Sequence, residues 1–309
     1  MISEDLLSAT EQAAIAVWPL VGKRDKVAAD EAAVRALRRV LGAAPISGRV
    51  VIGEGEMDEA PMLYRGEEVG RGGEPLDIAV DPLEGTNLTA KNQPGAVCVI
   101  AAGPPKSLLE APDMMMQRLA GPPACLGRIG LDQPVEEMVA EVARCLGKPA
   151  SQVVVVMLER DRHLPLIEGV VRAGATLRLI TDGDVMPSVL AAVGDSGVDL
   201  VLGSGGAPEG VLAAVAIAAL GGVFEGRLLP EGQADLRAME DLGLKSGRIL
   251  SLKDVVSRHG VFCATSVTGG WQLDGPAVVG ASIWVHSLVI DGTAKTVRRI
   301  HSRYPMTAS

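Results

Sequence analysis

The sequence contains few aromatic residues: only 2% of its 309 residues are Phe, Trp or Tyr. Stacking platforms for nucleic-acid bases and aromatic sugar-binding clefts are therefore not expected. The net charge of −9, with Lys and Arg mostly scattered, also argues against a track for nucleic-acid phosphates. A small anionic substrate remains possible if positive charge is local or is supplied by a metal ion.

Cysteines are also few, and they are spread out as Cys98, Cys125, Cys145 and Cys263. Without a Cys-x-x-Cys pair, neither a disulfide framework nor a thiolate zinc site is predicted, and reduced thiols are expected. The first residues, MISEDLLSATEQ, carry acids where a signal peptide needs basic and then apolar residues. No uncharged apolar run reaches membrane-spanning length. We expect a cytoplasmic protein without membrane contact.

Apolar residues make up 48% of the chain, enough to build one large or two ordinary domains. Between residues 153 and 220, strand-like and helix-like segments alternate. Such alternation predicts parallel strands joined by crossover helices. Near the C-terminus, the Asp291-Gly292 turn signal between two strand-like segments predicts an antiparallel hairpin.

Carboxylates cluster in two segments that each follow a predicted strand. GEGEMDEAP at 53–61 follows the strand VVI, and DPLEGT at 81–86 follows the strand IAV, which we expect to end at Val80. Either segment could be an ordinary solvated turn. However, neither contains Lys or Arg, and like charges this close repel each other unless a cation joins them. Oxygen ligands without His or Cys favour Mg²⁺ or Mn²⁺ over zinc.

One acidic residue stands on an apolar helix face. A helix is predicted from about Asp25 to Leu41, and its apolar stripe of Val27, Val34, Leu37 and Leu41 is completed by Asp30. An ionised, unpaired carboxylate there would cost several kcal/mol. Asp30 is therefore expected to be protonated, salt-bridged, at the rim of the core or bound to a cation.

A second group of polar residues follows three strands of the alternating region. The predicted strands at 153–158, 177–180 and 198–202 run into ERDRH, TDGDV and GSGGAPEG. Arg160 and Arg162 are suited to phosphate, and the glycines before Pro208 are typical of a helix N-terminus that admits phosphate. Glu209 adds negative charge there, a conflict that a metal ion between Glu209 and phosphate would resolve. A surface Arg pair and a plain helix start are the alternatives.

Several motifs together resemble one enzyme family across essentially the whole chain. GEGEMDEAPMLYRGE, DIAVDPLEGTNLTA, EAPDM, TDGDV, GGAPEGV and FCATSVTGG resemble class II fructose-1,6-bisphosphatases, the bacterial type within the lithium-sensitive, metal-dependent sugar and inositol phosphatases. The resemblance implies gluconeogenic hydrolysis of the 1-phosphate of fructose 1,6-bisphosphate to fructose 6-phosphate. Alternatives are a related phosphatase acting on sedoheptulose 1,7-bisphosphate or an inositol phosphate, and, less favoured, a non-catalytic sugar-phosphate-binding protein.

The expected fold class is α/β of mixed α+β character, in a layered αβαβα sugar-phosphatase architecture with two closely packed lobes. Residues 1–130 with 261–309 are expected to form the metal-binding catalytic lobe. Residues 131–260 are expected to form an alternating β/α lobe that contributes sugar-phosphate contacts.

The resemblance also assigns roles to residues that match the family motifs. The implied ligands of Mg²⁺ or Mn²⁺ are Asp30, Glu54, Asp81, Glu84 and Glu209. Asp58 and Thr86 match the pair that orients and deprotonates the attacking water. The implied substrate contacts are Glu84, Gly85, Thr86, Met115, Arg160, Arg162, Asp182, Gly183, Asp184 and Gly206. Two of these depart from the family pattern, because Arg160 replaces a Lys and Met115 replaces a Tyr.

The remaining expectations concern histidines and partners. His163, His259, His286 and His301 stand outside the carboxylate motifs and are interpreted as structural or surface residues, with His163 the one plausible substrate contact. Met114 to Met116, interpreted as a Met-rich surface, and the antiparallel C-terminal strands favour a homo-oligomer, a dimer or tetramer. The only other expected partner is a small sugar bisphosphate.

Overall fold

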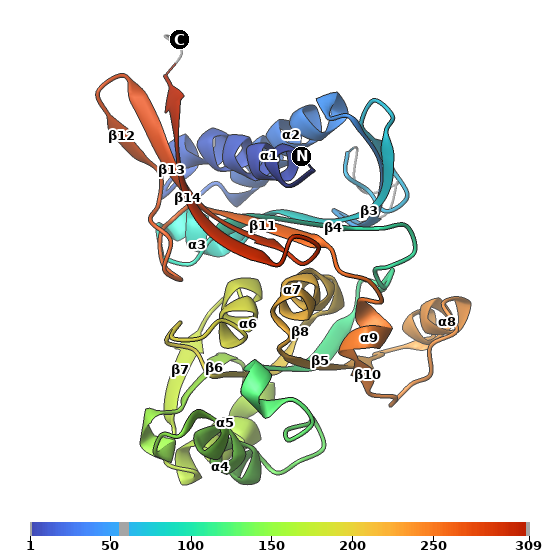
Figure 1. The fold of residues 1–309 in the computed structure, drawn as a ribbon, viewed down its shortest axis with the longest axis vertical. Coiled ribbons are helices and arrows are strands. Elements are labelled where there is room, and N and C mark those ends of the chain that lie inside the picture. Colours follow the sequence, from blue (N-terminus) through green and yellow to red (C-terminus); the bar gives the residue numbers. More distant parts are fainter. Residues whose placement is uncertain (1, 56–61, 307–309) are drawn as a thin grey trace. The chain divides into compact units, whose positions relative to one another are not determined.

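The computed structural model describes residues 2–55 and 62–306, which divide into two compact units. Unit 1 is made of the described parts of Met1–Leu108 and Arg258–Ser309, and unit 2 is Leu109–Ser257. Each unit is built on its own mixed sheet with helices packed on it (Figure 1). The predicted mixed α/β class is confirmed.

The sheet of unit 1 is mostly antiparallel. Its strands are β1 (Ile46–Ile52), β2 (Glu68–Val69), β3 (Glu74–Glu84), β4 (Val97–Gly103), β11 (Val261–Ser266), β12 (Ala277–Val279), β13 (Ser282–Asp291) and β14 (Thr296–Pro305). Among the described residues these eight strands follow the order β12-β13-β11-β4-β3-β1-β2, with β14 paired to β13. The pair of β1 and β3 is parallel. Strands β13 and β14 form the predicted antiparallel hairpin, in register from Ser282 opposite Pro305 to Asp291 opposite Thr296.

Two helices pack on this sheet, and a short one follows β3. They are α1 (Ile2–Val17), α2 (Lys26–Ala43) and α3 (Thr86–Lys91). Helix α2 begins where predicted, because the Asp25 side chain accepts a hydrogen bond from the Ala28 N–H at 3.0 Å. Helices α1 and α2 lie side by side, and their small and branched apolar residues share a core with β1, β3, β4 and β11 (Figure 1).

Unit 2 is an α/β/α arrangement. Its strands are β5 (Met115–Gly121), β6 (Val154–Leu158), β7 (Thr176–Ile180), β8 (Leu200–Gly206), β9 (Val223–Leu229) and β10 (Leu250–Ser251). Their order is β10-β9-β5-β8-β6-β7, and β6 is parallel to both β7 and β8, as the alternating sequence predicts. Its helices are α4 (Val135–Leu146), α5 (Leu164–Arg172), α6 (Val185–Ala191), α7 (Ala207–Leu220), α8 (Gln233–Asp241) and α9 (Leu252–Val255).

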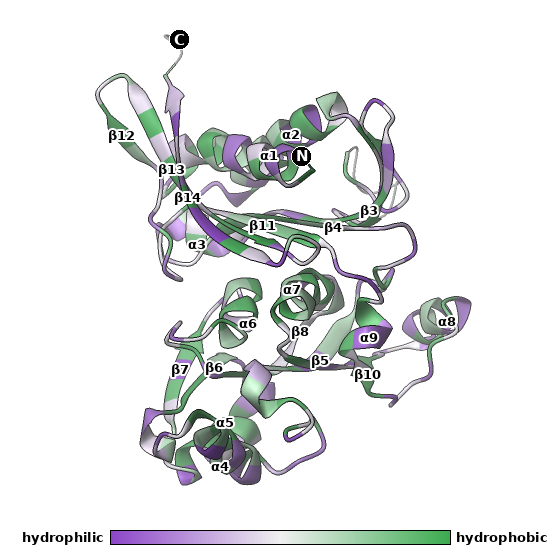
Figure 2. Ribbon diagram, viewed as in Figure 1, coloured by the Kyte–Doolittle hydropathy of each residue, from purple (hydrophilic) through white to green (hydrophobic). Residues whose placement is uncertain are grey.

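The helices of unit 2 cover both faces of its sheet. Helices α4 and α5 lie on one face and α6 and α7 on the other (Figure 1). Figure 2 shows α7 as apolar around most of its circumference, and its residues from Gly210 to Ile217 are all buried. This helix is therefore a core element rather than an amphipathic surface helix.

Three sequence-based expectations need correction. Strand β3 does not end at Val80 but continues to Glu84. Val27 is 62% exposed, so the buried stripe of α2 is built by Ala29, Ala33 and Ala36 with Val34, Leu37 and Leu41. The Met-rich segment is not a surface, because Met114 is 7% and Met116 0% exposed.

The division of the chain also differs from the expected lobes, because residues 109–130 belong to unit 2 and residues 258–260 to unit 1. Strand β5 pairs with β8 and β9 of unit 2, whereas the expected boundary at residue 130 groups it with the first lobe. No helix in the described part of the chain has the length and apolar character that a membrane span requires.

Candidate active site

Two carboxylates stand near the end of strand β3. Asp81 lies opposite Val99 of β4 and Glu84 opposite Val97, and the register shifts between the two acids. The irregularity accommodates Pro82, which lacks the N–H that regular pairing uses. The Asp81 Oδ1 accepts a hydrogen bond from the Leu83 N–H at 3.1 Å, and Glu84 is 6% exposed. The acids of DPLEGT are thus held on a strand within the sheet and are not part of a solvated turn.

Asp30 of α2 belongs to the same neighbourhood. Burial raises the pKa of the Cys98 thiol on β4, and the negative charges of Asp81 and Asp30 raise it further, so both carboxylates lie close to this thiol. Burial, and then the charge of Glu31, raises the pKa of Asp30 itself. Among the described residues no salt bridge to Asp30 is found, which leaves the salt-bridge alternative without support.

These three acids fit a hard divalent cation. They offer only oxygen atoms as ligands. The negative charges of Asp30 and Asp81 both raise the pKa of the buried Cys98 thiol. Burial disfavours the charged form of Asp30, and a bound cation would favour that form. The donor set therefore suits Mg²⁺ or Mn²⁺ better than zinc.

The other acidic segment follows β1. Glu54 is half-buried, and its N–H donates to the Leu63 carbonyl at 2.9 Å. A Cβ on Gly53 would lie 1.9 Å from that carbonyl oxygen, so this approach of two backbone segments requires glycine. The predicted catalytic Asp58 lies outside the described residues, as do Glu56 and Glu59.

A sharp turn joins the segment that carries Asp81 and Glu84 to α3. Gly85 has a φ of +88°, in the left-handed region, and precedes Thr86, the first residue of the helix. Strand β3 and helix α3 are therefore separated by a single residue. Thr86 is half-buried and lies two positions after Glu84.

In unit 2, the parallel strands bring the predicted phosphate-binding loops to one edge. Leu158 at the end of β6 lies opposite Ile180 at the end of β7. Arg160 then ties the two following loops together, because its guanidinium donates to the carbonyls of Glu159 and Thr181, each at 2.8 Å. In the second loop the Asp182 Oδ1 accepts the Gly183 N–H at 3.1 Å, and Gly183 has a φ of +78°.

The Arg162 side chain is held by hydrogen bonds to Ser204 of β8. Its Nε donates to the Ser204 Oγ at 2.8 Å and its Nη2 to the Ser204 carbonyl at 2.9 Å. These bonds use two of the five guanidinium N–H donors. Because the Arg162 side chain is exposed, the rest of the fork faces solvent and can bind phosphate.

A buried arginine holds two further predicted substrate contacts. Arg118 of β5 is 2% exposed, and its Nη2 lies 2.5 Å from the Asp184 Oδ2. Its Nη1 donates to the Gly206 carbonyl at 3.2 Å. Arg118 therefore links Asp184 at the start of α6 to Gly206 at the end of β8.

The glycines of GSGG are explained by this packing. A Cβ on Gly203 would lie 2.9 Å from the His163 ring, and a Cβ on Gly205 would lie 2.1 Å from the Arg118 Nη2. A Cβ on Gly206 would lie 2.1 Å from the Glu209 Oε2. The three glycines thus leave room for three side chains that pack against the backbone. Only the side chain next to Gly206, that of Glu209, is a predicted metal ligand.

Met115 and Glu209 complete the predicted set in this unit. Met115 lies directly opposite Gly206 in the pairing of β5 with β8, so the structure brings these two positions together. Glu209 stands in the first turn of α7, where a negative charge interacts favourably with the helix dipole.

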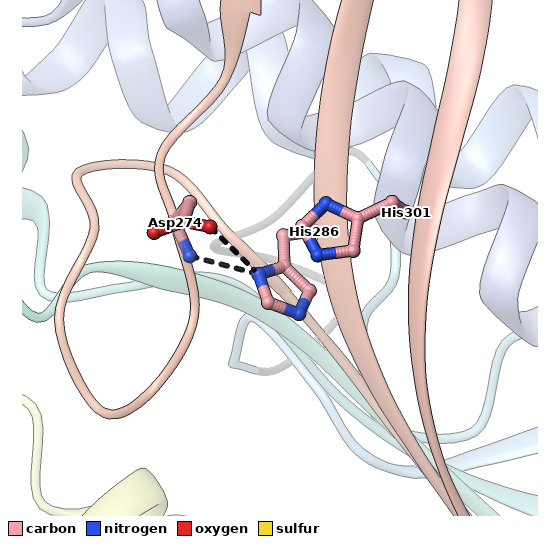
Figure 3. Close-up of side chains that lie close together, drawn as sticks. All are labelled: Asp274, His286 and His301. Atoms are coloured by element: carbon pink, nitrogen blue, oxygen red, sulfur yellow. Dashed lines mark hydrogen bonds and ion pairs between the residues drawn. The ribbon is translucent and has the colours of Figure 1, made fainter.

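A separate group of possible metal ligands lies in unit 1. Asp274, His286 and His301 each offer a ligand atom, all within 4.8 Å of one another (Figure 3). However, the two imidazole rings are stacked, with centroids 3.7 Å apart, so their in-plane lone pairs run side by side. The His286 Nδ1 already accepts the Asp274 N–H at 3.0 Å. This geometry suits a structural tie between a loop and the β13–β14 hairpin better than a metal centre.

Sequence reasoning missed Arg118 and Ser204, and it considered His163 either a structural residue or a substrate contact. Arg118 is a single charge inside the otherwise apolar end of β5, and that anomaly was a usable signal. Ser204 stands between glycines, where nothing in the sequence marks its two bonds to Arg162. Contacts of this kind join residues 41 to 88 positions apart, which local patterns do not report.

Comparisons with known proteins agree with these features. A protein-family model described as "Bacterial fructose-1,6-bisphosphatase, glpX-encoded" matches residues 1–304. The chain is 42% identical over 308 residues to "Fructose-1,6-bisphosphatase 1 class 2" of Escherichia coli K12, covering 95% of this chain and 92% of that protein. Identity to the Haemophilus influenzae "Fructose-1,6-bisphosphatase class 2" is also 42%, with the same coverage. A Synechococcus elongatus "D-fructose 1,6-bisphosphatase class 2/sedoheptulose 1,7-bisphosphatase" is 37% identical over 324 residues, covering 96% and 94%.

Proposed function

The chain belongs to the bacterial fructose-1,6-bisphosphatase family, and from this premise we propose that it hydrolyses the 1-phosphate of fructose 1,6-bisphosphate to fructose 6-phosphate. Family membership makes the chain a phosphatase, a hydrolase of phosphoric monoesters. The observation that carries the proposal is the match over residues 1–304, which spans both acidic segments and all three strand-end loops. A non-catalytic binding protein would not need to keep every one of these acids.

We propose that divalent metal is held by the five acids that match the family motifs: Asp30, Glu54, Asp81, Glu84 and Glu209. The proposed ion is Mg²⁺ or Mn²⁺, in agreement with the oxygen-only donors. When bound, the ion neutralises phosphoryl oxygens, lowers the pKa of water and stabilises the leaving alkoxide. The burial of Glu84 and the raised pKa of Asp30 support this assignment for unit 1.

Thr86 and Asp58 are proposed to activate the attacking water. The Thr86 hydroxyl accepts a hydrogen bond from the water, and the water's proton passes through this hydroxyl to the Asp58 carboxylate. The rigid turn at Gly85 supports the role of Thr86, because it fixes the residue relative to Glu84. The role of Asp58 rests on the sequence motif.

The substrate is proposed to bind through the loops at the strand ends of unit 2 and the Glu84-Gly85-Thr86 turn. Arg160 and Arg162 supply positive charge to a phosphate, and Arg162 presents a fork already fixed by Ser204. Asp182, Gly183 and Asp184 are proposed to contact the sugar phosphate, together with Gly206. Met115, opposite Gly206, offers no hydrogen-bond donor where relatives have a Tyr.

We further propose a cytoplasmic homo-oligomer, either a dimer or a tetramer. With Met114 and Met116 buried, its support moves to the C-terminal strands, where Val279 of β12 is 63% and Val297 of β14 is 48% exposed. Light scattering of the purified protein measures the assembly, and a monomer at all concentrations contradicts this part of the proposal.

A second substrate is favoured by one comparison, since the Synechococcus relative is named for both fructose and sedoheptulose bisphosphates. The experiment that tests the proposal is a phosphate-release assay on a panel of fructose 1,6-bisphosphate, sedoheptulose 1,7-bisphosphate and inositol monophosphate. It is run with Mg²⁺ or Mn²⁺ and again with a chelator. Activity on fructose 1,6-bisphosphate that chelation abolishes supports the proposal, and activity on inositol monophosphate alone contradicts it.

A further inference from the structure

His163 lies behind the arginine that is proposed to bind phosphate. It is 2% exposed, and its ring packs against Gly203, whose φ of +133° and missing Cβ make room for it. It lines a small cavity of unit 2 together with Arg118, Asp184 and Ser204. Its position next to Arg162 in sequence suggested a substrate contact, but the side chain points into unit 2 and not into solvent.

The hydrogen bonds of His163 determine its tautomer. The Nδ1 lies 2.8 Å from the Leu158 carbonyl oxygen, which can only accept, so Nδ1 carries a proton. The Ser204 N–H donates to Nε2 at 2.8 Å, so Nε2 is the unprotonated acceptor. In a cationic ring Nε2 would also carry a proton, and its N–H would face the Ser204 N–H, donor against donor. The ring is therefore neutral, and burial, which lowers the pKa of His163, agrees with this.

Ser204 connects His163 to Arg162 through hydrogen bonds. The Ser204 Oγ lies 3.0 Å from the same Nε2 and can donate to it, while its oxygen accepts from the Arg162 Nε at 2.8 Å. The Ser204 carbonyl accepts the second guanidinium bond at 2.9 Å. The backbone and side chain of Ser204 are thus each bonded to His163 on one side and to Arg162 on the other.

We propose that His163 is a positioning residue for substrate binding: through Ser204, its neutral imidazole holds the Arg162 guanidinium in the orientation that binds the substrate phosphate. The inference rests on the proposed function, since it needs Arg162 to bind a phosphate of the substrate. His163 does not touch the substrate itself. Its loss should weaken substrate binding and leave the chemical step nearly unchanged.

The test compares two amide replacements that each keep one half of the imidazole. His163→Gln places an amide oxygen near the position of Nε2, where it can accept the Ser204 N–H. His163→Asn places an amide N–H near Nδ1, where it can donate to Leu158 but leaves Ser204 without its acceptor. Steady-state kinetics on fructose 1,6-bisphosphate should show KM raised roughly 3- to 30-fold in His163→Asn, with kcat within about threefold of wild type. The Gln variant should recover most of this loss.

A double-mutant cycle separates positioning from general damage. Arg162→Ala should raise KM roughly tenfold to a hundredfold, because a charged hydrogen bond to phosphate is removed. On that background His163→Asn should have no further effect on KM, since the group it positions is gone. His259→Asn, at an exposed histidine of unit 1, is the matched control and should behave as wild type.

The outcomes separate the two proposals. If wild type hydrolyses fructose 1,6-bisphosphate but the effects of His163→Asn and Arg162→Ala on KM multiply, the positioning role is wrong and the proposed function stands. Equal losses in the Asn and Gln variants likewise overturn it, because they indicate a packing role. If wild type releases no phosphate from fructose 1,6-bisphosphate, the proposed function fails, and the positioning inference fails with it.

Discussion

Replacing Gly205 with alanine tests whether the buried frame of unit 2 is as rigid as its contacts indicate. The new Cβ would lie 2.1 Å from the Arg118 Nη2 and 2.8 Å from the Asp184 Oδ2. Gly205 is not among the glycines with positive φ, so alanine fits the backbone and the cost comes from packing alone. This separates Gly205 from Gly203, where a φ of +133° adds strain.

The magnitude follows from how Arg118 is held. Arg118 is 2% exposed and is bonded to Asp184 and to the Gly206 carbonyl, so its side chain cannot move out into solvent to avoid the new Cβ. Overpacking a rigid core costs about 1–3 kcal/mol. If the guanidinium leaves Asp184, the cost approaches the roughly 3–5 kcal/mol of a broken buried ion pair. We therefore expect Gly205→Ala to lose about 2–4 kcal/mol of unfolding free energy.

Urea unfolding followed by circular dichroism measures this loss. Gly194→Ala is the matched control, because Gly194 is exposed, belongs to the same unit and has space around it: a Cβ added there would meet no heavy atom within 4 Å. It should be neutral or stabilise by less than about 1 kcal/mol. A Gly205→Ala protein within about 0.5 kcal/mol of wild type would show that Arg118 and Asp184 move aside at little cost and that this packing is not rigid.

Four further outcomes are expected. Thr86→Val should lower kcat by about 10² to 10⁴ with Mn²⁺ affinity changed less than about tenfold, and a kcat within about threefold of wild type would rule out the proton relay. Asp30→Ala should weaken Mn²⁺ binding in calorimetric titration, and unchanged affinity in a folded variant would remove it from the ligand set. Met115→Tyr should lower KM by adding a phenolic donor opposite Gly206, whereas an unchanged or higher KM would show that the ring points elsewhere. Burial lowers the pKa of His163 and His286 below the 6.5 of the unfolded chain, so as the pH falls the unfolded chain binds protons at these histidines before the folded chain does. Their contribution to the free energy of unfolding is therefore fully present above pH 6.5 and is lost as the pH falls from 6.5 through the lowered pKa values. Denaturant unfolding should show up to about 1.4 kcal/mol lost per pH unit for each histidine, and a loss unchanged in His163→Gln would contradict that part.

Local patterns predicted those parts of the fold that depend on neighbours in sequence. The start of α2 near Asp25, the parallel strands β6, β7 and β8 and the β13–β14 hairpin all follow from helical periodicity, strand–helix alternation and turn chemistry. Proline led to a wrong prediction at β3, because a register shift lets the strand pass Pro82 and carry Asp81 and Glu84 inside the sheet. A proline removes one donor, but it does not end a strand that has such an irregularity.

Burial on a particular face was harder to predict than element type. The α2 stripe was expected to include Val27, yet small alanines fill the tight helix contact and Val27 is exposed. Met114, just before β5, and Met116 on β5 are buried, whereas Met115 between them is half-buried, a pattern that is invisible until the pairing of β5 is known. The same ignorance of pairing hid the bond between Arg118 and Asp184, which are 66 positions apart.

Phosphorus NMR of the reaction can show whether the chain is a metal-dependent fructose-1,6-bisphosphatase. Fructose 1,6-bisphosphate is incubated with the enzyme and Mg²⁺, and the C1 and C6 phosphate resonances are followed separately. We expect the C1 resonance to be replaced by inorganic phosphate while the C6 resonance persists, and no reaction when the metal is chelated. Loss of the C6 phosphate first, or turnover that continues in the chelated enzyme, would show that the chain is not a metal-dependent fructose-1,6-bisphosphatase of the proposed kind.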